Sequence, residues 1–190
     1  SAGYHEKYIY SNTGDPVSQF VEKRVNDNSR DGQMWTRNWT DALGRTVKKE
    51  SKAFKVANIT EITQYDLLGR VSRKSGSYLA GVEAPPYYNY EYNDPAGRLT
   101  KTTNPDGTSV TVSYNGLNVT TTDAKGLTHT TVKNELGQTI SKTDSGITTN
   151  YGYDEAGRLA VIQSNSGTTQ FSFDNSGKKL TQSDPNSGTT

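Results

Sequence analysis

Aspartate, glycine and arginine recur together along the chain, and their side chains suggest two kinds of chemistry. The aspartates could supply oxygen ligands for calcium, and the arginines could bind an anionic sugar. A calcium site, however, needs roughly six to eight oxygens that converge on one point, whereas these carboxylates are spread singly along the sequence. The recurring residues are Asp41, Gly44, Arg45, Asp66, Gly69, Arg70, Asp94, Gly97, Arg98, Asp154, Gly157, Arg158, Asp174 and Gly177.

Turn chemistry explains the same pattern without a ligand. An aspartate at the first position of a type I turn accepts a hydrogen bond from the backbone two residues later. A glycine at the fourth position adopts a positive φ without a steric clash. The long side chain that follows can cover a neighbouring aromatic ring. We therefore interpret these residues as structural turn residues, and we expect no metal site, no cofactor and no catalytic residue among them.

A cluster of tyrosines offers a second kind of chemistry. Tyr88, Tyr90 and Tyr92 alternate along the chain, so in a strand they would share one face. Such rings can stack on sugars, and Trp35 and Trp39 are near them in the repeat order. Tyrosines at alternate strand positions more often pack against cross-strand neighbours. We favour packing, and we keep glycan stacking as the alternative.

The remaining residues give little support for an enzyme. His5 and His129 are isolated in the sequence, and no metalloprotease, nucleophile-elbow or phosphate-loop motif is present. The absence of cysteine excludes disulfides, thiolate metal sites and cysteine nucleophiles. We therefore predict a protein that is not an enzyme.

Composition narrows the class of protein further. The formal net charge of +1 gives no electrostatic reason to expect nucleic acid as a partner. No apolar run approaches the roughly 18 residues of a membrane span. Twelve tyrosines and two tryptophans provide apolar surface in a chain that is otherwise polar. We expect a folded chain with a thin, aromatic-rich core.

The spacing of the turns predicts the fold. Gly137, Gly157 and Gly177 follow one another at 20-residue steps. A second series of turns, such as Asp123–Gly126 and Ser145-Gly146, falls between members of the first. The segments between turns are rich in Thr, Val, Tyr and Phe and alternate in polarity, as half-buried strands do. The prediction is an all-β chain, an antiparallel meander of tandem β-hairpin repeats that forms a curved or spiralling sheet.

The repeats differ in regularity along the chain. We predict one continuous array, in which residues 1–96 hold irregular repeats with longer inserted loops and residues 97–190 hold regular repeats. The extra loops are expected at 26–32 and 75–86. At Tyr114–Leu117 the turn is shortened and lacks the usual spacing of aspartate and glycine.

Several segments resemble the YD repeat consensus of the RHS family. The close copies are Tyr65-Asp-Leu-Leu-Gly-Arg-Val71, Tyr92-Asn-Asp-Pro-Ala-Gly-Arg-Leu99 and Tyr153-Asp-Glu-Ala-Gly-Arg-Leu159, and Trp39-Thr-Asp-Ala-Leu-Gly-Arg-Thr46 is looser. With weaker copies the resemblance covers nearly the whole chain. The family includes bacterial polymorphic toxins, insecticidal toxin complexes and teneurins, in which the repeats form a sheet that spirals into a hollow shell.

The resemblance implies a structural role. In the toxins the shell encloses an effector that is released by autoproteolysis, but Asp184-Pro-Asn-Ser-Gly188 matches only the start of the cleavage motif, so cleavage is not expected here. We predict a non-catalytic wall segment of a secreted or bacterial cell-surface protein. Its partners would be further repeats of the parent chain and an enclosed effector domain, with self-association through open strand edges. The alternative is an adhesion or glycan-binding module.

Overall fold

The computed structural model describes residues 5–11, 18–26, 34–52, 57–83, 85–185 and 188–189. These residues form strands and turns without a helix, and all of the strand pairs with an assigned register are antiparallel. The predicted all-β meander of hairpins is therefore confirmed. None of the described residues belongs to a helix long and apolar enough to cross a membrane.

The chain divides into two compact units. The first comprises Ser1–Glu91 and Thr102–Gly107, and the second comprises Tyr92–Lys101 and Thr108–Thr190. The first unit contains β1 (His5–Ser11), β2 (Phe20–Asn26), β3 (Met34–Thr40), β4 (Thr46–Ser51), β5 (Ile59–Tyr65), β6 (Val71–Ser75), β7 (Tyr78–Leu79) and β8 (Tyr87–Glu91). The short strand β9 (Lys101–Thr103) lies at the division between the units.

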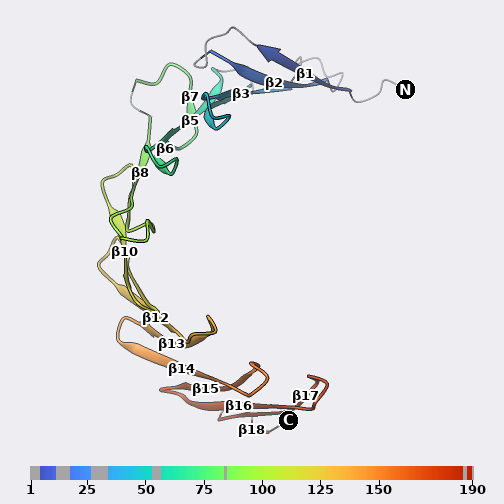
Figure 1. Cartoon of the computed structure of the whole chain (residues 1–190), viewed down its shortest axis with the longest axis vertical. Coiled ribbons are helices and arrows are strands. Elements are labelled where there is room, and N and C mark those ends of the chain that lie inside the picture. Colours follow the sequence, from blue (N-terminus) through green and yellow to red (C-terminus); the bar gives the residue numbers. More distant parts are fainter. Residues whose placement is uncertain are drawn as a thin grey trace. The chain divides into compact units, whose positions relative to one another are not determined.

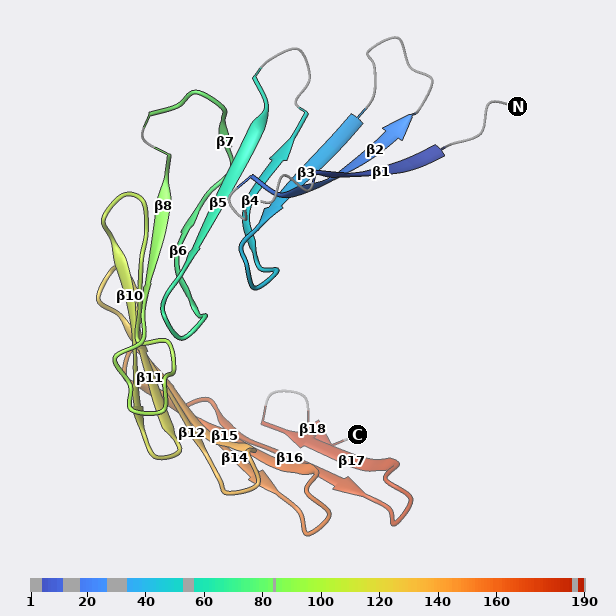
Figure 2. The same ribbon diagram turned by 45° about the horizontal axis from the view of Figure 1, so that its top comes forward.

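The second unit continues the meander. Its strands are β10 (Ser109–Asn115), β11 (Asn118–Thr122), β12 (Thr128–Lys133), β13 (Thr139–Asp144), β14 (Ile147–Tyr153), β15 (Leu159–Ser164), β16 (Gly167–Phe173), β17 (Lys179–Asp184) and β18 (Gly188–Thr189). The hairpins β12–β13, β14–β15 and β16–β17 lie side by side in sequence order (Figures 1 and 2). The predicted boundary near residue 97 concerns the regularity of the repeats and stays a prediction.

The two predicted loops have different outcomes. Apart from Asn26, the loop expected at 26–32 lies outside the described residues. The loop expected at 75–86 contains β7, whose Tyr78 and Leu79 pair with Thr60 and Ile59 of β5. The prediction missed this strand because two residues are too few to show an alternating pattern.

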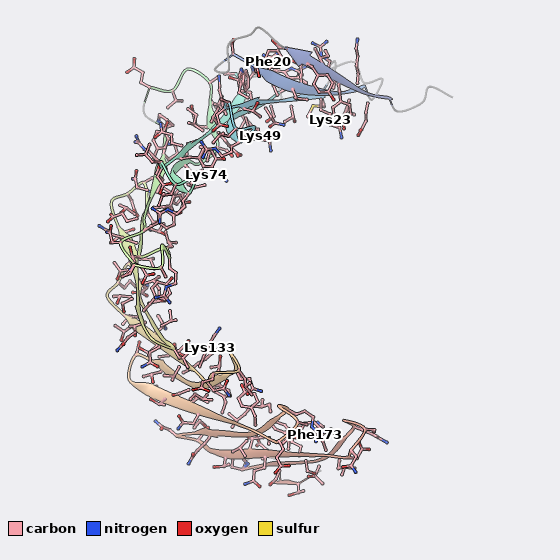
Figure 3. The ribbon with its side chains drawn as sticks, viewed as in Figure 1. Phe20, Lys23, Lys49, Lys74, Lys133 and Phe173 are labelled. Carbon is pink, nitrogen blue, oxygen red and sulfur yellow. The ribbon has the colours of Figure 1, made fainter. Side chains whose placement is uncertain are left out.

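Strand register gives the sheet of the first unit two different faces. Phe20, Trp39, Lys48 and Ile62 form one row across β2–β5. The adjacent row on the opposite face contains the polar Asn38, Lys49 and Glu61. Phe20 and Lys49 accordingly project from opposite sides of this sheet in Figure 3.

The second unit carries a row of hydroxyls on one face. Thr120, Thr130, Thr143 and Thr148 face one another across β11–β14. Thr120 and Thr130 are hydrogen bonded at 3.0 Å, and Thr143 and Thr148 at 2.8 Å. Tyr114 lies on the other face, opposite Val119. Aromatic and hydroxyl side chains are thus separated by strand alternation.

Several hairpins contain an irregularity in strand register next to the turn. Tyr153 pairs with Leu159, whereas Gly152 pairs with Val161, so Ala160 has no partner of its own. The same shift occurs in the hairpins β3–β4, β5–β6, β12–β13 and β16–β17. Such a β-bulge turns the side chains of the returning strand and increases its twist.

Burial in this sheet is only partial. Among the described residues no hydrophobic side chain is fully buried, and the buried residues are Glu22, Thr60 and Ser75. The Ser75 hydroxyl accepts a hydrogen bond of 2.7 Å from the backbone amide of Ile62. Half-buried side chains and backbone pairing therefore hold the sheet together, in place of a core between two layers.

Thr60 provides a test of this packing. Its Oγ1 is buried and has no hydrogen-bond partner among the described residues. A Thr60→Val substitution should raise the free energy of unfolding by about 1 kcal/mol, because it removes an unpaired buried hydroxyl. Thr120→Val is the matched control, since it removes a hydroxyl that is hydrogen bonded to Thr130, and it should not stabilise the chain. Urea unfolding measures both, and a destabilised Thr60→Val variant would contradict the expectation.

Candidate functional site

The recurring turn is well defined at Asp154. Its Oδ1 accepts hydrogen bonds from the backbone amides of Ala156 at 3.1 Å and Arg158 at 2.8 Å, and its Oδ2 accepts one from Arg158 Nε at 2.7 Å. The Gly157 amide donates to the Asp154 carbonyl at 2.9 Å, and the Asp154 amide donates to the Arg158 carbonyl at 2.9 Å. One carboxylate therefore holds both the backbone of the turn and the arginine side chain.

The same backbone arrangement recurs along the chain. In each case the aspartate carboxylate accepts hydrogen bonds from the amides two and four residues later, and the glycine amide donates to the aspartate carbonyl. These turns begin at Asp41, Asp66, Asp94, Asp123 and Asp174. At the first three, the arginine also donates from its side chain to the carboxylate.

One repeat builds this turn from neutral residues. Asn134 Oδ1 accepts from the amides of Leu136 at 3.1 Å and Gln138 at 2.9 Å, and Asn134 Nδ2 donates to Gln138 Oε1 at 2.7 Å. An amide pair thus replaces the ion pair of aspartate and arginine. The turn requires hydrogen-bonding geometry more than charge.

Hydrogen bonding changes the ionisation of the turn aspartates. The backbone amide of Arg158 is the main cause of the lowered pKa of Asp154, and desolvation opposes it. At Asp94 the side-chain hydrogen bonds from Arg98 are the main cause, and they lower the pKa from 3.8 to about 2. The same hydrogen bonds raise the pKa of Arg98. The carboxylates are therefore held in their charged form.

Three of the arginines that follow a turn glycine also reach the next repeat. The Arg45 guanidinium lies 4.4 Å from the ring centroid of Tyr65, and that of Arg98 lies 3.9 Å from Tyr114. Arg158 lies 4.8 Å from the Phe173 ring. These distances are within the range of cation–π attraction.

The next repeat contacts the preceding one in return. Tyr65 Oη donates to the carbonyl of Thr46 at 3.0 Å, and Tyr153 Oη donates to the carbonyl of Thr139 at 2.8 Å. Tyr114 Oη makes the equivalent bond to Leu99 at 3.0 Å. Each accepting residue directly follows the long polar side chain of the preceding turn.

Turn carbonyls complete the connection between repeats. Gln138 Nε2 donates to the Gly157 carbonyl at 2.9 Å, and Arg158 Nη1 donates to the Asp174 carbonyl at 2.8 Å. We call these contacts from one turn to the next the turn ladder. It comprises Arg45 with Tyr65, Arg98 with Tyr114, Gln138 with Gly157, and Arg158 with Phe173 and Asp174.

The turn ladder adds a second reason for glycine in the turn. Gly157 has a φ of +79°, which favours glycine, and an added Cβ would lie 3.3 Å from Gln138 Nε2 of the preceding turn. At Gly69 an added Cβ would lie 3.1 Å from Arg45 Nη1. Glycine therefore leaves room for the side chain of the neighbouring repeat.

The predicted tyrosine cluster is only partly assembled in one strand. Tyr88 and Tyr90 lie in β8 and line an open depression of about 300 Å³ with Lys74 and Glu61. Ser77 also lines it and donates to Glu61 Oε1 at 2.7 Å. Tyr92 follows the end of β8 and belongs to the second unit.

Trp35 and Trp39 belong to a different cluster, which sequence reasoning missed. They lie on the opposite face of the sheet from Tyr88 and Tyr90. The Arg37 guanidinium lies 5.0 Å from the Trp35 ring and 5.6 Å from the Trp39 ring. The alternation Trp-x-Arg-x-Trp in β3 was the signal, because alternate residues share a face.

A buried carboxylate lies within this tryptophan cluster. Glu22 is only 2 % exposed and forms ion pairs with Arg24 and Arg37. Arg37 Nε donates to Glu22 Oε2 at 2.8 Å. Burial raises the pKa of Glu22, but the hydrogen bonds from the two arginines outweigh it and the net shift is downward. The arginines thus pair a charge that burial alone would disfavour.

Of the two isolated histidines, His129 is the one whose side chain the structure describes. His129 Nδ1 lies 2.7 Å from Asp144 Oδ1, and both side chains are exposed. The side chain of His5 lies outside the described residues. No group of three histidine, aspartate or glutamate side chains in the described part of the chain could hold a metal ion.

Comparison with known families identifies the repeat. The teneurin YD-shell family matches residues 76–184, which is more than half of the chain. The chain therefore belongs to this family, and the predicted RHS/YD-repeat assignment is confirmed.

Solved toxin complexes have a similar fold. The crystal structure of TcdB2-TccC3-Cdc42 matches with a TM-score of 0.72 and 13 % identity, over 94 % of this chain and 12 % of that chain. The crystal structure of TcdB2-TccC3 matches with a TM-score of 0.65 and 12 % identity, over 93 % of this chain and 13 % of that chain. The Tc holotoxin pore of Photorhabdus luminescens matches with a TM-score of 0.63 and 13 % identity, over 88 % of this chain and 12 % of that chain.

The chain corresponds to only a small part of these structures, about an eighth of each matched chain. No curated protein sequence matches it.

Replacing Gly157 tests the turn. Gly157→Val should lower the free energy of unfolding by about 1–2 kcal/mol, because a β-branched residue would have to adopt a positive φ. Gly137→Val is the matched control, since its φ is +78° and no atom lies within 4 Å of an added Cβ. Gly157→Val should therefore cost at least as much as the control in urea unfolding. An unchanged midpoint for Gly157→Val would refute the turn assignment.

Acid should weaken the turns. An aspartate whose pKa is lower in the folded chain than in the unfolded chain stabilises the fold above its unfolded pKa. For Asp94 this contribution should be lost as the pH falls from about 4 towards about 2. Thermal unfolding of the wild type and of Asp94→Asn across this range measures the effect. The variant should depend less steeply on pH, and identical profiles would contradict the prediction.

Proposed function

We propose that the chain is a non-catalytic structural segment of the wall of an RHS-type shell in a larger, secreted, toxin-like protein. The turn ladder carries this proposal. The residues that could do chemistry, above all the turn aspartates and arginines, are engaged within their own turn and with the next one. Groups held in this way connect repeats and have little capacity left for a ligand.

The repeated geometry supports an array whose stability is shared between neighbours. Each ladder contact joins a turn to the next turn along the chain, as in other repeat proteins with nearest-neighbour stabilisation. Under this proposal Asp41, Asp66, Asp94, Asp154 and Asp174, with the glycines and arginines of their turns, serve structure. The array would comprise an irregular part over residues 1–96 and a regular part over residues 97–190.

The matched toxin complexes support the idea of a longer parent chain. The present chain covers only 12–13 % of each matched chain. We infer that further repeats of the parent chain, and an effector enclosed by them, are its partners. Secretion or attachment to a bacterial surface is part of the same proposal.

A glycan-binding role is the second candidate, and the tyrosine depression favours it. Tyr88 is 37 % exposed, so its ring is accessible to a sugar. Lys74 and the hydrogen-bonded pair Glu61 and Ser77 supply polar groups beside the rings. Aromatic rings flanked by polar groups are common in sites that orient small ligands.

The wall proposal is tested in the longer polypeptide that contains this segment. The double substitution Asp154→Ala and Asp174→Ala removes two turn carboxylates. If the segment is a wall, limited proteolysis should then degrade the polypeptide that the shell encloses, which is protected in the wild type. The control is Tyr88→Ser with Tyr90→Ser, which leaves the turns intact and should keep protection. Cleavage confined to the two altered turns would overturn the wall proposal.

The glycan candidate is tested by the same tyrosine variant. A glycan array is probed with the 190-residue chain and with the Tyr88→Ser and Tyr90→Ser double variant. Binding that is lost in the variant would support an adhesion module. Absence of binding by the wild type would eliminate this candidate.

A further inference from the structure

Arg73 differs from every other arginine in the described part of the chain. The other arginines form ion pairs with a carboxylate: Arg24 and Arg37 with Glu22, and Arg45, Arg70, Arg98 and Arg158 with the aspartates of their turns. The Arg73 side chain has a ring contact, but its guanidinium forms no ion pair or hydrogen bond with the described residues. Arg73 is therefore the one arginine in the described ranges whose guanidinium has no carboxylate partner there.

Arg73 is nevertheless held in place. It lies in β6, its backbone pairs with Asn89 of β8, and its guanidinium lies 3.7 Å from the ring centroid of Tyr87. Stacking on a ring orients the guanidinium plane and leaves its N–H groups available at the edge. The side chain is exposed, so these donors are accessible to solvent.

An open depression surrounds this stacked arginine. Its volume is about 570 Å³, within the range of roughly 300–1,000 Å³ typical of ligand sites. Pro85, Pro86 and Pro105 give it apolar walls, and Asn89 and Asn104 contribute polar groups.

The charge of this depression comes from Arg73. Among the described residues no aspartate or glutamate lines it, and Asp106 belongs to the Asn104–Gly107 turn without lining the depression. The site therefore presents one fixed cation, amide groups and rigid apolar walls. A ligand that fits this site would place one planar anionic group against Arg73 and a less polar group against the proline walls.

We propose that Arg73 and Tyr87 form a site that binds an aspartate or glutamate side chain of another polypeptide segment. A carboxylate matches the two-pronged guanidinium edge, as Asp94 does when it accepts from Arg98 Nε at 2.9 Å and Nη2 at 2.8 Å. The side-chain amide of Asn89, which lines the depression, can donate to and accept from the backbone of such a segment. This site goes beyond the wall function, because it recognises a partner instead of a neighbouring repeat.

The proposal is tested by NMR titration of the 190-residue chain, with the side-chain amide signals of Asn89 and Asn104 as the readout. The probes are two blocked tripeptides that differ only in a central aspartate or asparagine. The aspartate peptide should bind at least about tenfold more tightly, because only it forms charge-assisted hydrogen bonds with Arg73. Equal binding of the two peptides would overturn the proposal.

Substitutions assign the binding to Arg73. Arg73→Gln should weaken binding of the aspartate peptide by at least about tenfold, and Arg73→Lys should also weaken it, because lysine keeps the charge and loses the planar fork. Lys74→Gln is the matched control: it removes the same charge from the adjacent residue, which lines the tyrosine depression instead, and it should bind normally. Thermal unfolding of each variant verifies that it is folded. Unchanged binding by Arg73→Gln, or an equal loss with Lys74→Gln, would overturn the assignment.

Two further probes distinguish other anions. Inorganic phosphate and glucuronate are titrated under the same conditions. Weaker binding of both than of the aspartate peptide supports a polypeptide ligand. Tighter binding of phosphate, or of glucuronate, would replace the proposed ligand with a phosphorylated group or an acidic sugar. Neither result bears on the wall proposal, which is tested separately by limited proteolysis.

Discussion

The structure depends on the hydrogen bonds that one turn side chain makes to its own backbone and to the long side chain that follows. At Asp154 a single carboxylate fixes the turn backbone and positions Arg158. Arg158 is thereby held against Phe173 and the Asp174 carbonyl of the next repeat. In a sheet without fully buried hydrophobic side chains among its described residues, these contacts add side-chain order to backbone pairing. The same arginine side chain therefore takes part in the turn and in the connection to the next repeat.

The neutral turn at Asn134 shows which property of this interaction is essential. Asn134 and Gln138 reproduce both the capping of the turn and the contact with the following repeat, without charge. The aspartate–arginine version adds an ion pair and a guanidinium that can stack on a ring. At exposed sites such ion pairs contribute little on their own. Directional hydrogen bonding is thus the constraint that the repeats share.

The first unit uses a different arrangement on one face. Glu22 is buried between Arg24 and Arg37, and Arg37 also lies over Trp35 and Trp39. This cluster covers aromatic surface with paired charges, where the described residues provide no second layer. Arg73 lies on the same face, stacked on Tyr87 but without a carboxylate partner among the residues that the structure describes. Arg24 and Arg37 are engaged by Glu22 and help to hold the sheet together. Arg73 is the arginine that we propose to bind a partner.

The sequence by itself determined the class of fold, because hairpin turns are local. Asp154, Gly157 and Arg158 lie within a few residues of one another, so their spacing and types were enough to predict a turn and, from its repetition, a meander. The sequence also suggested that the arginines would cover aromatic rings, though not which rings. Only the tertiary structure placed Trp35 and Trp39 on the face opposite Tyr88 and paired β7 with β5. It also placed Arg73 in a depression that no carboxylate of the described residues lines. These features depend on strand register and on side chains brought together from different hairpins, and a one-residue change in register would transfer each side chain to the other face.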